Sequence, residues 1–437
     1  MEGDHRGPPG RAGALLLLSA RAPRFAVPSP GRLLGICGSL LQPVRWQRPG
    51  CRSVPAPPQP DHLLRHRLVL HLQGPDRIQH PGVDQDEGGR AFAPIRPGPA
   101  RGGLVSRPLL SIVVPTYNRH RILNRTLPSL LGQEGVGAEY EVIMVVDGST
   151  DGTLAMLKRT EWGSRLRVVA QPNRGQASAR NRGAAEARGE ILLFLDDDMI
   201  AAPDLVSVHV EEHGSSRERV ILGDMGLAEG VRRSFLKRGV EEWGRDYAQR
   251  LSTPGYRFRF DDWHSGHASI ARSLFVALGG FDESFVAYGN EDYDLGWRLI
   301  QRGIEIRFSA RALARQIYDK DFIAWLRDVY CVGRADVALV EKHPPIALEL
   351  RLSRREAHPL KRLARWSGLA SLDPLAPAWA ALAGTLMVAE RLSLGGPFLS
   401  HTQSLIGERV YWRGIRDARD TALPTITRAM KRPGRAA

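Results

Sequence analysis

The pattern of hydrophobic and polar positions changes at residue 109. Residues 1–108 are rich in Pro, Gly and Arg and show no periodic apolar pattern. From Leu109 onward, short apolar runs alternate with segments whose apolar residues recur at helical spacing. We therefore expect a low-order, disordered segment over 1–108, an α/β domain over 109–320 and a helical extension over 321–437.

Four apolar runs have the length and residue types of buried β-strands, at 110–114, 141–146, 166–170 and 191–195. Helical spacing fills the intervals between them, at 122–131, 153–158 and 175–187. Such alternation predicts a parallel, doubly wound sheet. Later segments predict short strands, an aromatic loop over 256–263, a helix over 292–302 and mainly helical structure beyond 317.

Polar residues follow three of the four expected strands, at 116–119, 147–149 and 196–198. The carboxyl ends of parallel strands meet at one edge of a sheet, and ligands of doubly wound folds bind beyond that edge. We therefore expect these three segments to converge on a single site.

Asp196, Asp197 and Asp198 end the fourth expected strand. If they are partly buried, their mutual repulsion costs on the order of a few kcal/mol. A plain turn is the competing interpretation, although a turn typically places one acid beside Gly or Asn. Mg²⁺ or Mn²⁺ would relieve the repulsion and would also bind substrate phosphates, so the pattern favours a metal–diphosphate site.

Two further acids each allow two interpretations. Asp147 can accept hydrogen bonds from a nucleobase or ribose, or it can belong to the turn and helix cap of the following Ser-Thr-Asp-Gly. Asp292 can cap the helix that it precedes, where the helix dipole favours a carboxylate. It can also act as a general base toward an acceptor hydroxyl. The local pattern does not decide between the two roles of Asp147, and it slightly favours capping for Asp292.

The net charge of +14 suggests anionic partners. Residues 1–108 supply about +8 of it, because they hold 15 Arg, no Lys and 7 acids. No recognition-helix, RRM or OB signature accompanies the charge, so a nucleic-acid partner is not expected. The basic segment 361–366 is interpreted as a solvated helix or a contact with a membrane surface.

Cellular location is inferred from two features of the composition. No apolar run reaches the roughly 18–20 residues of a membrane-spanning helix. The three cysteines, Cys37, Cys51 and Cys331, include no CxxC pair, which favours a reducing compartment. We expect Cys331 to pack as a small apolar residue. The expected location is the cytoplasm, with peripheral contact at the inner face of the membrane.

Six motifs, in order and spacing, resemble those of family 2 glycosyltransferases with the GT-A fold. They are PTYNR at 115–119, VDGSTDGT at 146–153, NRGQASARN at 173–181, LDDD at 195–198, GGFDE at 279–283 and GNEDYDL at 289–295. The resemblance covers roughly 109–320. It implies a mixed, doubly wound sheet flanked by helices. It also implies inverting, metal-dependent transfer of a sugar from a UDP- or GDP-sugar to a hydroxyl of a glycan or lipid-linked acceptor.

The resemblance assigns donor binding to Pro115, Thr116, Tyr117, Asn118, Arg119, Asp147, Arg180 and Asp197. The first three would line the nucleobase pocket, with Asp147 bonding the base and Asp197 near the ribose. Asp196 and Asp198 would form the metal-binding DxD element with Mn²⁺ or Mg²⁺. Asp292 would be the catalytic base. Acceptor contacts are assigned to Gly266, His267 and Glu291.

Three positions depart from the family pattern. Val146 stands where many members have a first acid, and His267 stands where Asn is usual. Many relatives carry a His near the metal after the last core strand, where the nearest residues here are Arg315 and Gln316. A third protein ligand is therefore not expected. The alternative function is a degenerate domain that binds a nucleotide or glycan without turnover, and the intact Asp198 and Asp292 argue against it.

Overall fold

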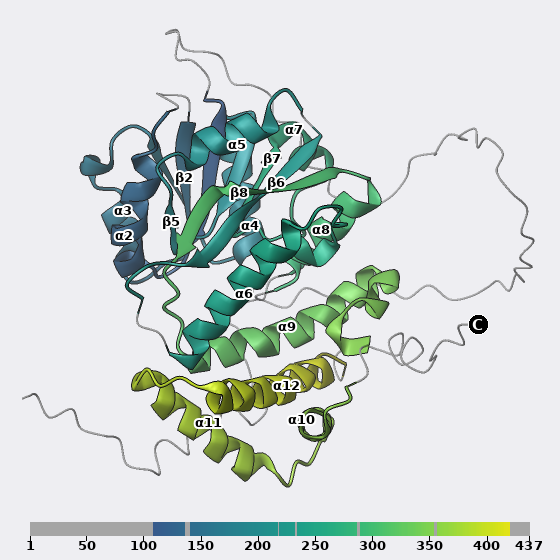
Figure 1. The fold of residues 1–437 in the computed structure, drawn as a ribbon. Helices are drawn as coiled ribbons and strands as arrows, with labels where there is room; N and C mark the ends of the chain where they lie inside the picture. The colour runs from purple at the N-terminus through teal and green to yellow at the C-terminus, as the bar shows by residue number, and fades with distance from the viewer. Residues whose placement is uncertain are drawn as a thin grey trace, which may run out of the picture.

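The computed structural model describes residues 108–135, 140–216, 218–231, 234–285, 289–353 and 356–419. The N-terminal segment expected over 1–108 lies outside these ranges except for Pro108. Cys37 and Cys51 also lie outside them. Within them, a sheet flanked by helices is followed by a layer of long helices (Figure 1).

Eight strands form one sheet in the order β3-β2-β1-β4-β7-β6-β8-β5. Their bounds are β1 (Leu110–Thr116), β2 (Tyr140–Asp147), β3 (Leu166–Gln171), β4 (Ile191–Leu195), β5 (Met199–Ala201), β6 (Arg219–Leu227), β7 (His267–Ala271) and β8 (Glu305–Gln316). All four strands expected from the apolar runs are confirmed. β1 lies at the centre of the parallel half, with every residue buried.

The sheet is mixed, as the fold prediction requires. Strands β3, β2, β1 and β4 run parallel to one another. Strand β7 is antiparallel to both β4 and β6, and β5 is antiparallel to β8. Because β7 enters beside β4 in the opposite direction, its first residue lies level with the last residue of β4. The start of β7 therefore adjoins the strand ends at which the site was expected.

The helices of this domain are α2 (His120–Leu131), α3 (Thr153–Leu157), α4 (Gln176–Glu186), α5 (Leu205–His213), α6 (Phe235–Leu251), α7 (Arg272–Ala277) and α8 (Glu291–Gln301). Helix α4 packs on β1 and β2, and α5 packs on β6 and β8. Amphipathic α6 lies between the sheet and the C-terminal helices (Figure 1). The helices expected from periodicity are confirmed to within two residues at each end.

The C-terminal extension is helical, as expected. It contains α9 (Phe322–Lys342), α10 (Pro359–Leu369), α11 (Ala376–Arg391) and α12 (Pro397–Arg419). Helices α9 and α12 pack along each other, with Tyr330 of α9 donating a 2.9 Å hydrogen bond to Asp417 of α12. Among the helices in the described ranges, none combines the length and apolar content needed to cross a bilayer. Cys331 lies half-buried on α9, and burial raises the pKa of its thiol.

Candidate active site

A cavity of about 750 Å³ opens at the carboxyl ends of β1, β2 and β4. Helices α6, α9 and α12 supply part of its wall, so the site lies between the sheet and the helical extension. Of the donor, metal, acceptor and catalytic residues predicted from sequence, the following line it: Pro115, Thr116, Tyr117, Arg119, Asp147, Arg180, Asp196, Asp197, Asp198, Gly266, Glu291 and Asp292. The three polar strand ends thus meet in one place.

Asp147 ends β2 and is buried, with both carboxylate oxygens engaged. Oδ1 accepts hydrogen bonds from Gln171 Nε2 at 2.9 Å and from the Arg174 backbone N–H at 2.8 Å. Oδ2 accepts from the Gly175 backbone N–H at 2.9 Å. Asp147 therefore fixes the loop that leads into α4. Because it also lines the cavity, this structural role coexists with the predicted place beside the donor.

The three adjacent aspartates each face a different partner. Asp196 Oδ1 forms an ion pair with Arg180 Nη2 at 2.9 Å, and Asp197 Oδ1 lies 3.5 Å from Arg119 Nε. Asp198 accepts a 3.1 Å hydrogen bond from Gln316 Nε2. The ion pairs of Asp196 and Asp197 with two arginines reduce the repulsion among the three carboxylates but do not abolish it. Burial, together with the charges of Asp196 and Asp197, raises the pKa of Asp198 to about 8.

The start of β7 leaves room for the Asp196 side chain. Gly266 accepts a hydrogen bond from the Asp196 backbone N–H at 3.0 Å. A Cβ atom on Gly266 would lie 2.8 Å from Asp196 Oδ2. A side chain at this position would therefore displace the carboxylate, which explains why glycine fits where β7 meets the end of β4.

Arg180 links the predicted metal site to the predicted catalytic site. Its side chain is 2% exposed and bridges Asp196 Oδ1 at 2.9 Å and Glu291 Oε1 at 3.0 Å. Burial opposes the charge of Arg180, but Asp196, Asp292 and Glu291 together raise its pKa above the ordinary value. Burial and the neighbouring Asp292 raise the pKa of Glu291. The cation thus stabilises three carboxylates that would otherwise repel one another.

Asp292 lies in the first turn of α8 and does not use its full hydrogen-bonding capacity. Its Oδ2 accepts a 3.3 Å hydrogen bond from the Ser265 backbone N–H. Its Oδ1 is buried, and no group among the described residues donates to it. The N-cap residue of α8 is Asn290, and no side chain forms a capping hydrogen bond at the start of this helix. A buried carboxylate oxygen without a partner is costly and calls for an explanation, such as a catalytic role or a bound ligand.

The charges that line the cavity suit a divalent cation. Seven carboxylates line it against four cationic side chains, so an anionic diphosphate would meet a negative surface. Asp196 and Asp198 offer hard oxygen ligands of the kind that Mg²⁺ and Mn²⁺ prefer. Among the residues that the structure describes, no group of three His, Cys, Asp or Glu side chains is arranged to hold a metal ion.

Two predicted site residues lie elsewhere. Asn118 has a left-handed backbone (φ 55°) and accepts a 2.7 Å hydrogen bond from the Thr150 N–H, so its side chain holds the loops together and does not line the cavity. His267 is fully buried against His209 of α5, 3.1 Å away between the Nε2 atoms. Alternation along β7 directs this ring away from the cavity, so an acceptor contact by the His267 side chain is not supported.

Several cavity residues were not found from the sequence. They come from α6, α9 and the segment before α9: Trp243, Tyr318, Lys320, Trp325 and Asp328. Amphipathic periodicity indicates that α6 and α9 have a buried face, but it does not indicate that part of that face borders a cavity. In the same way, Gln316 was named only as a candidate neighbour of the metal, and it contacts Asp198 directly.

Comparison with known families gives two matches within the sheet domain. Residues 111–275 match the family model "Glycosyl transferase family 2", and residues 245–318 match "N-terminal domain of galactosyltransferase". Among solved structures, a mannosyltransferase of Pyrobaculum calidifontis in complex with GDP-Man and Mn²⁺ is 19% identical, with a TM-score of 0.44. That likeness covers 71% of this chain and 86% of the other.

Curated relatives are similar over the same region. A validoxylamine A glucosyltransferase of Streptomyces hygroscopicus subsp. limoneus is 34% identical over 235 residues, covering 48% of this chain and 52% of that protein. An uncharacterized glycosyltransferase of Bacillus subtilis (strain 168) is 32% identical over 248 residues, covering 45% and 62%. The chain thus spans about half to three fifths of the length of these relatives. The likeness to glycosyl transferase family 2 therefore lies within the sheet domain, over residues 111–275.

Proposed function

We propose that the protein is an inverting, metal-dependent glycosyltransferase that moves a sugar from a nucleotide-diphosphate sugar to an acceptor hydroxyl. The observation that supports this most directly is the unpartnered buried oxygen of Asp292, in a residue that lines the same cavity as the aspartate triplet. A capping role for Asp292 would not explain the buried oxygen, because no side chain forms a capping hydrogen bond at the start of α8. The donor would lie against the ends of β1 and β2, and the acceptor against Gly266 and Glu291.

The reaction requires one proton acceptor and one stabilised leaving group. The Asp292 carboxylate takes the proton of the acceptor hydroxyl, whose oxygen bonds to the anomeric carbon as the bond to the nucleoside diphosphate breaks. A single displacement of this kind inverts the anomeric centre. Arg180, held by Asp196 and Glu291, keeps positive charge near the diphosphate. Mn²⁺ or Mg²⁺ bound to Asp196 and Asp198 would neutralise charge developing on the leaving group.

Donor turnover tests this function against that of a binding domain without activity. We expect the protein to release nucleoside diphosphate from UDP-glucose or GDP-mannose with Mn²⁺ present, with water or an added glycan as acceptor. UDP-glucose is chosen because one relative is named a glucosyltransferase, and GDP-mannose represents the other expected nucleotide. Melting temperatures that rise with a donor, together with turnover no faster than without protein across a panel of UDP- and GDP-sugars, would favour the degenerate domain.

We also propose that helix α10 makes peripheral contact with an anionic membrane surface. The helix buries Ala364, Ser367 and Gly368 and exposes Leu363 (41%) and Trp366 (52%) on its outer side. The basic residues of 361–366 lie on the same helix. Exposed Trp and Leu beside cationic residues are typical of helices that lie in the membrane interface.

Vesicle flotation measures this contact. We expect the protein to float with vesicles of phosphatidylcholine and phosphatidylglycerol and not with pure phosphatidylcholine. Trp366→Ser should lose most of this binding, whereas Val276→Ser, at an exposed apolar position of α7 (62%), should not. Equal flotation of Trp366→Ser and the wild type would count against a contact through α10.

A further inference from the structure

The entry to α8 is conformationally unusual. Gly289 has φ 115° and Asn290 has φ 69°, both in the positive-φ region, and Glu291 and Asp292 follow directly. A left-handed conformation is costly for residues other than glycine and persists when the surrounding structure holds it. The Asn290 side chain does not cap its own helix. What holds this turn therefore also sets the direction of Asp292.

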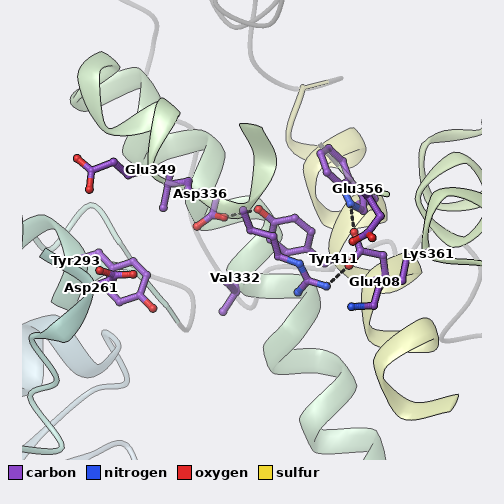
Figure 2. A pocket seen from close by; sticks show the side chains of 12 residues that line it. Asp261, Tyr293, Val332, Asp336, Glu349, Glu356, Lys361, Glu408 and Tyr411 are labelled. Carbon is purple, nitrogen blue, oxygen red and sulfur yellow. Dashed lines mark hydrogen bonds and ion pairs between the residues drawn. The ribbon is translucent and has the colours of Figure 1, made fainter. Parts of the chain in front are cut away.

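The turn is held from the helical extension by a buried hydrogen-bond chain. Asn290 Nδ2 donates a 2.7 Å hydrogen bond to Asp336 Oδ1 on α9, and the other oxygen of Asp336 accepts from the Tyr411 hydroxyl on α12. Asn290 and Asp336 are 6% and 3% exposed. Figure 2 shows Asp336 and Tyr411 directed toward each other beside a second cavity of about 400 Å³. Burial raises the pKa of Asp336, and the two donated hydrogen bonds offset part of that rise.

Helix α9 also contacts α8 on both sides of Asp292. Before it, a Cβ atom on Gly289 would lie 3.3 Å from Val332 Cγ2, so the turn packs closely on α9. After it, Asp294 Oδ1 lies 2.5 Å from Lys342 Nζ and 2.8 Å from His343 Nε2, at the end of α9. The turn at the start of α8 thus contacts, at three points, the segment from α9 to His343, which lies outside both family matches because these end at residues 275 and 318.

We infer that Asp336, together with Tyr411, is a positioning residue that holds the Asn290 turn and so aims Asp292 at the acceptor hydroxyl. The inference rests on the proposed function, in which Asp292 is the base. The Asp336 carboxylate is well suited to this task, because its two oxygens accept hydrogen bonds from two different elements while α9 contacts α8 directly. The helical extension is then part of the active site and not a separate module.

Two substitutions break the chain at different points. Asn290→Gly permits the left-handed backbone and removes the side chain with its amide donor, whereas Asp336→Ala removes the acceptor. A displaced catalytic group lowers the rate steeply, and a shift of about 1 Å can cost about 100-fold. We expect each variant to lower kcat for donor turnover about tenfold or more, with KM for the donor nearly unchanged. Asp336→Asn should retain most of the activity, because its amide can accept from Asn290 and donate to the Tyr411 oxygen.

A matched control separates positioning from general packing. Tyr330→Phe removes another phenol–carboxylate bond between α9 and α12, the one to Asp417, without touching Asn290. It should leave kcat unchanged, whereas Tyr411→Phe should lower it. If Tyr330→Phe and Tyr411→Phe lower kcat equally, the effect comes from helix packing and the inference is overturned.

A double-mutant cycle tests whether the Asn290 turn, which Asp336 holds, acts through Asp292. With Asp292→Asn as background, Asn290→Gly should lower the residual kcat hardly at all, because the group being aimed has gone. If Asn290→Gly lowers kcat by the same factor in the Asp292→Asn background as in the wild type, the inference is overturned. It is also overturned if Asn290→Gly alone has the kcat of the wild type. Failure of the proposed function looks different, since Asp292→Asn alone would then keep full activity. Should Asp336→Ala not fold, Asn290→Gly and Asp336→Asn still provide the comparison.

Discussion

Asp292→Asn should lower kcat for donor turnover at least about 100-fold, the range in which general-base catalysis typically contributes. The change keeps the shape of the side chain and removes its ability to take a proton. The Asn oxygen can still accept the hydrogen bond from the Ser265 N–H, and Asn is itself a good residue at a helix start. The melting temperature and the affinity for the donor should therefore barely move.

The measurements that accompany this variant separate the two roles of Asp292. Steady-state kinetics give kcat, and a thermal-shift titration with the donor gives stability and binding independently. If kcat is retained while stability falls, Asp292 stabilises the start of α8, where the helix dipole favours a carboxylate, and the catalytic assignment fails. With the wild-type enzyme, NMR of the product should show the anomeric configuration inverted relative to the donor. A retained configuration would contradict a single displacement.

The sequence was sufficient to predict the parallel half of the sheet. Apolar runs such as 191–195 are short, rich in large aliphatic residues and ended by polar residues. The lengths of the strands, and the place of the polar residues at one edge of the sheet, could therefore be predicted. Their convergence could be expected because parallel strands end on the same side. The antiparallel entry of β7 beside β4 could not be derived from periodicity, since a short buried strand carries no signal of direction.

The structure shows contacts that the local sequence does not reveal. Asp147 accepts three hydrogen bonds from the segment between β3 and α4, a long-range pairing that spacing along the chain does not indicate. At His267, in contrast, the family resemblance implied an acceptor contact that the structure does not support. The ring of His267 packs on His209 across the β7–α5 interface. Side-chain direction on β7 depends on register, which the motif alone does not fix.

Removal of divalent metal should abolish transfer, and Mn²⁺ or Mg²⁺ should restore it. The physical reason is the charge of the cavity, where seven carboxylates and four cationic side chains would have to accept a diphosphate. Without a cation, the remaining carboxylate charge of the cavity would repel the diphosphate of the donor. Burial and the charges of Asp196 and Asp197 raise the pKa of Asp198 to about 8, and a bound cation would favour its charged form. Full activity in excess EDTA would contradict this assignment.

Asp198→Asn gives the same test at a single residue. The substitution removes one of the two proposed metal ligands but keeps an oxygen toward Gln316, so folding should be little affected. We expect turnover to fall by about two orders of magnitude, as for loss of one group that stabilises the developing charge. The rise in melting temperature that UDP or GDP produces with Mn²⁺ should also disappear. Asp204→Asn, at the exposed start of α5, is the matched control and should behave as the wild type. If Asp198→Asn kept the Mn²⁺-dependent nucleotide shift, the metal would have to bind through other groups, and the DxD assignment would fail even with catalysis still sensitive to EDTA.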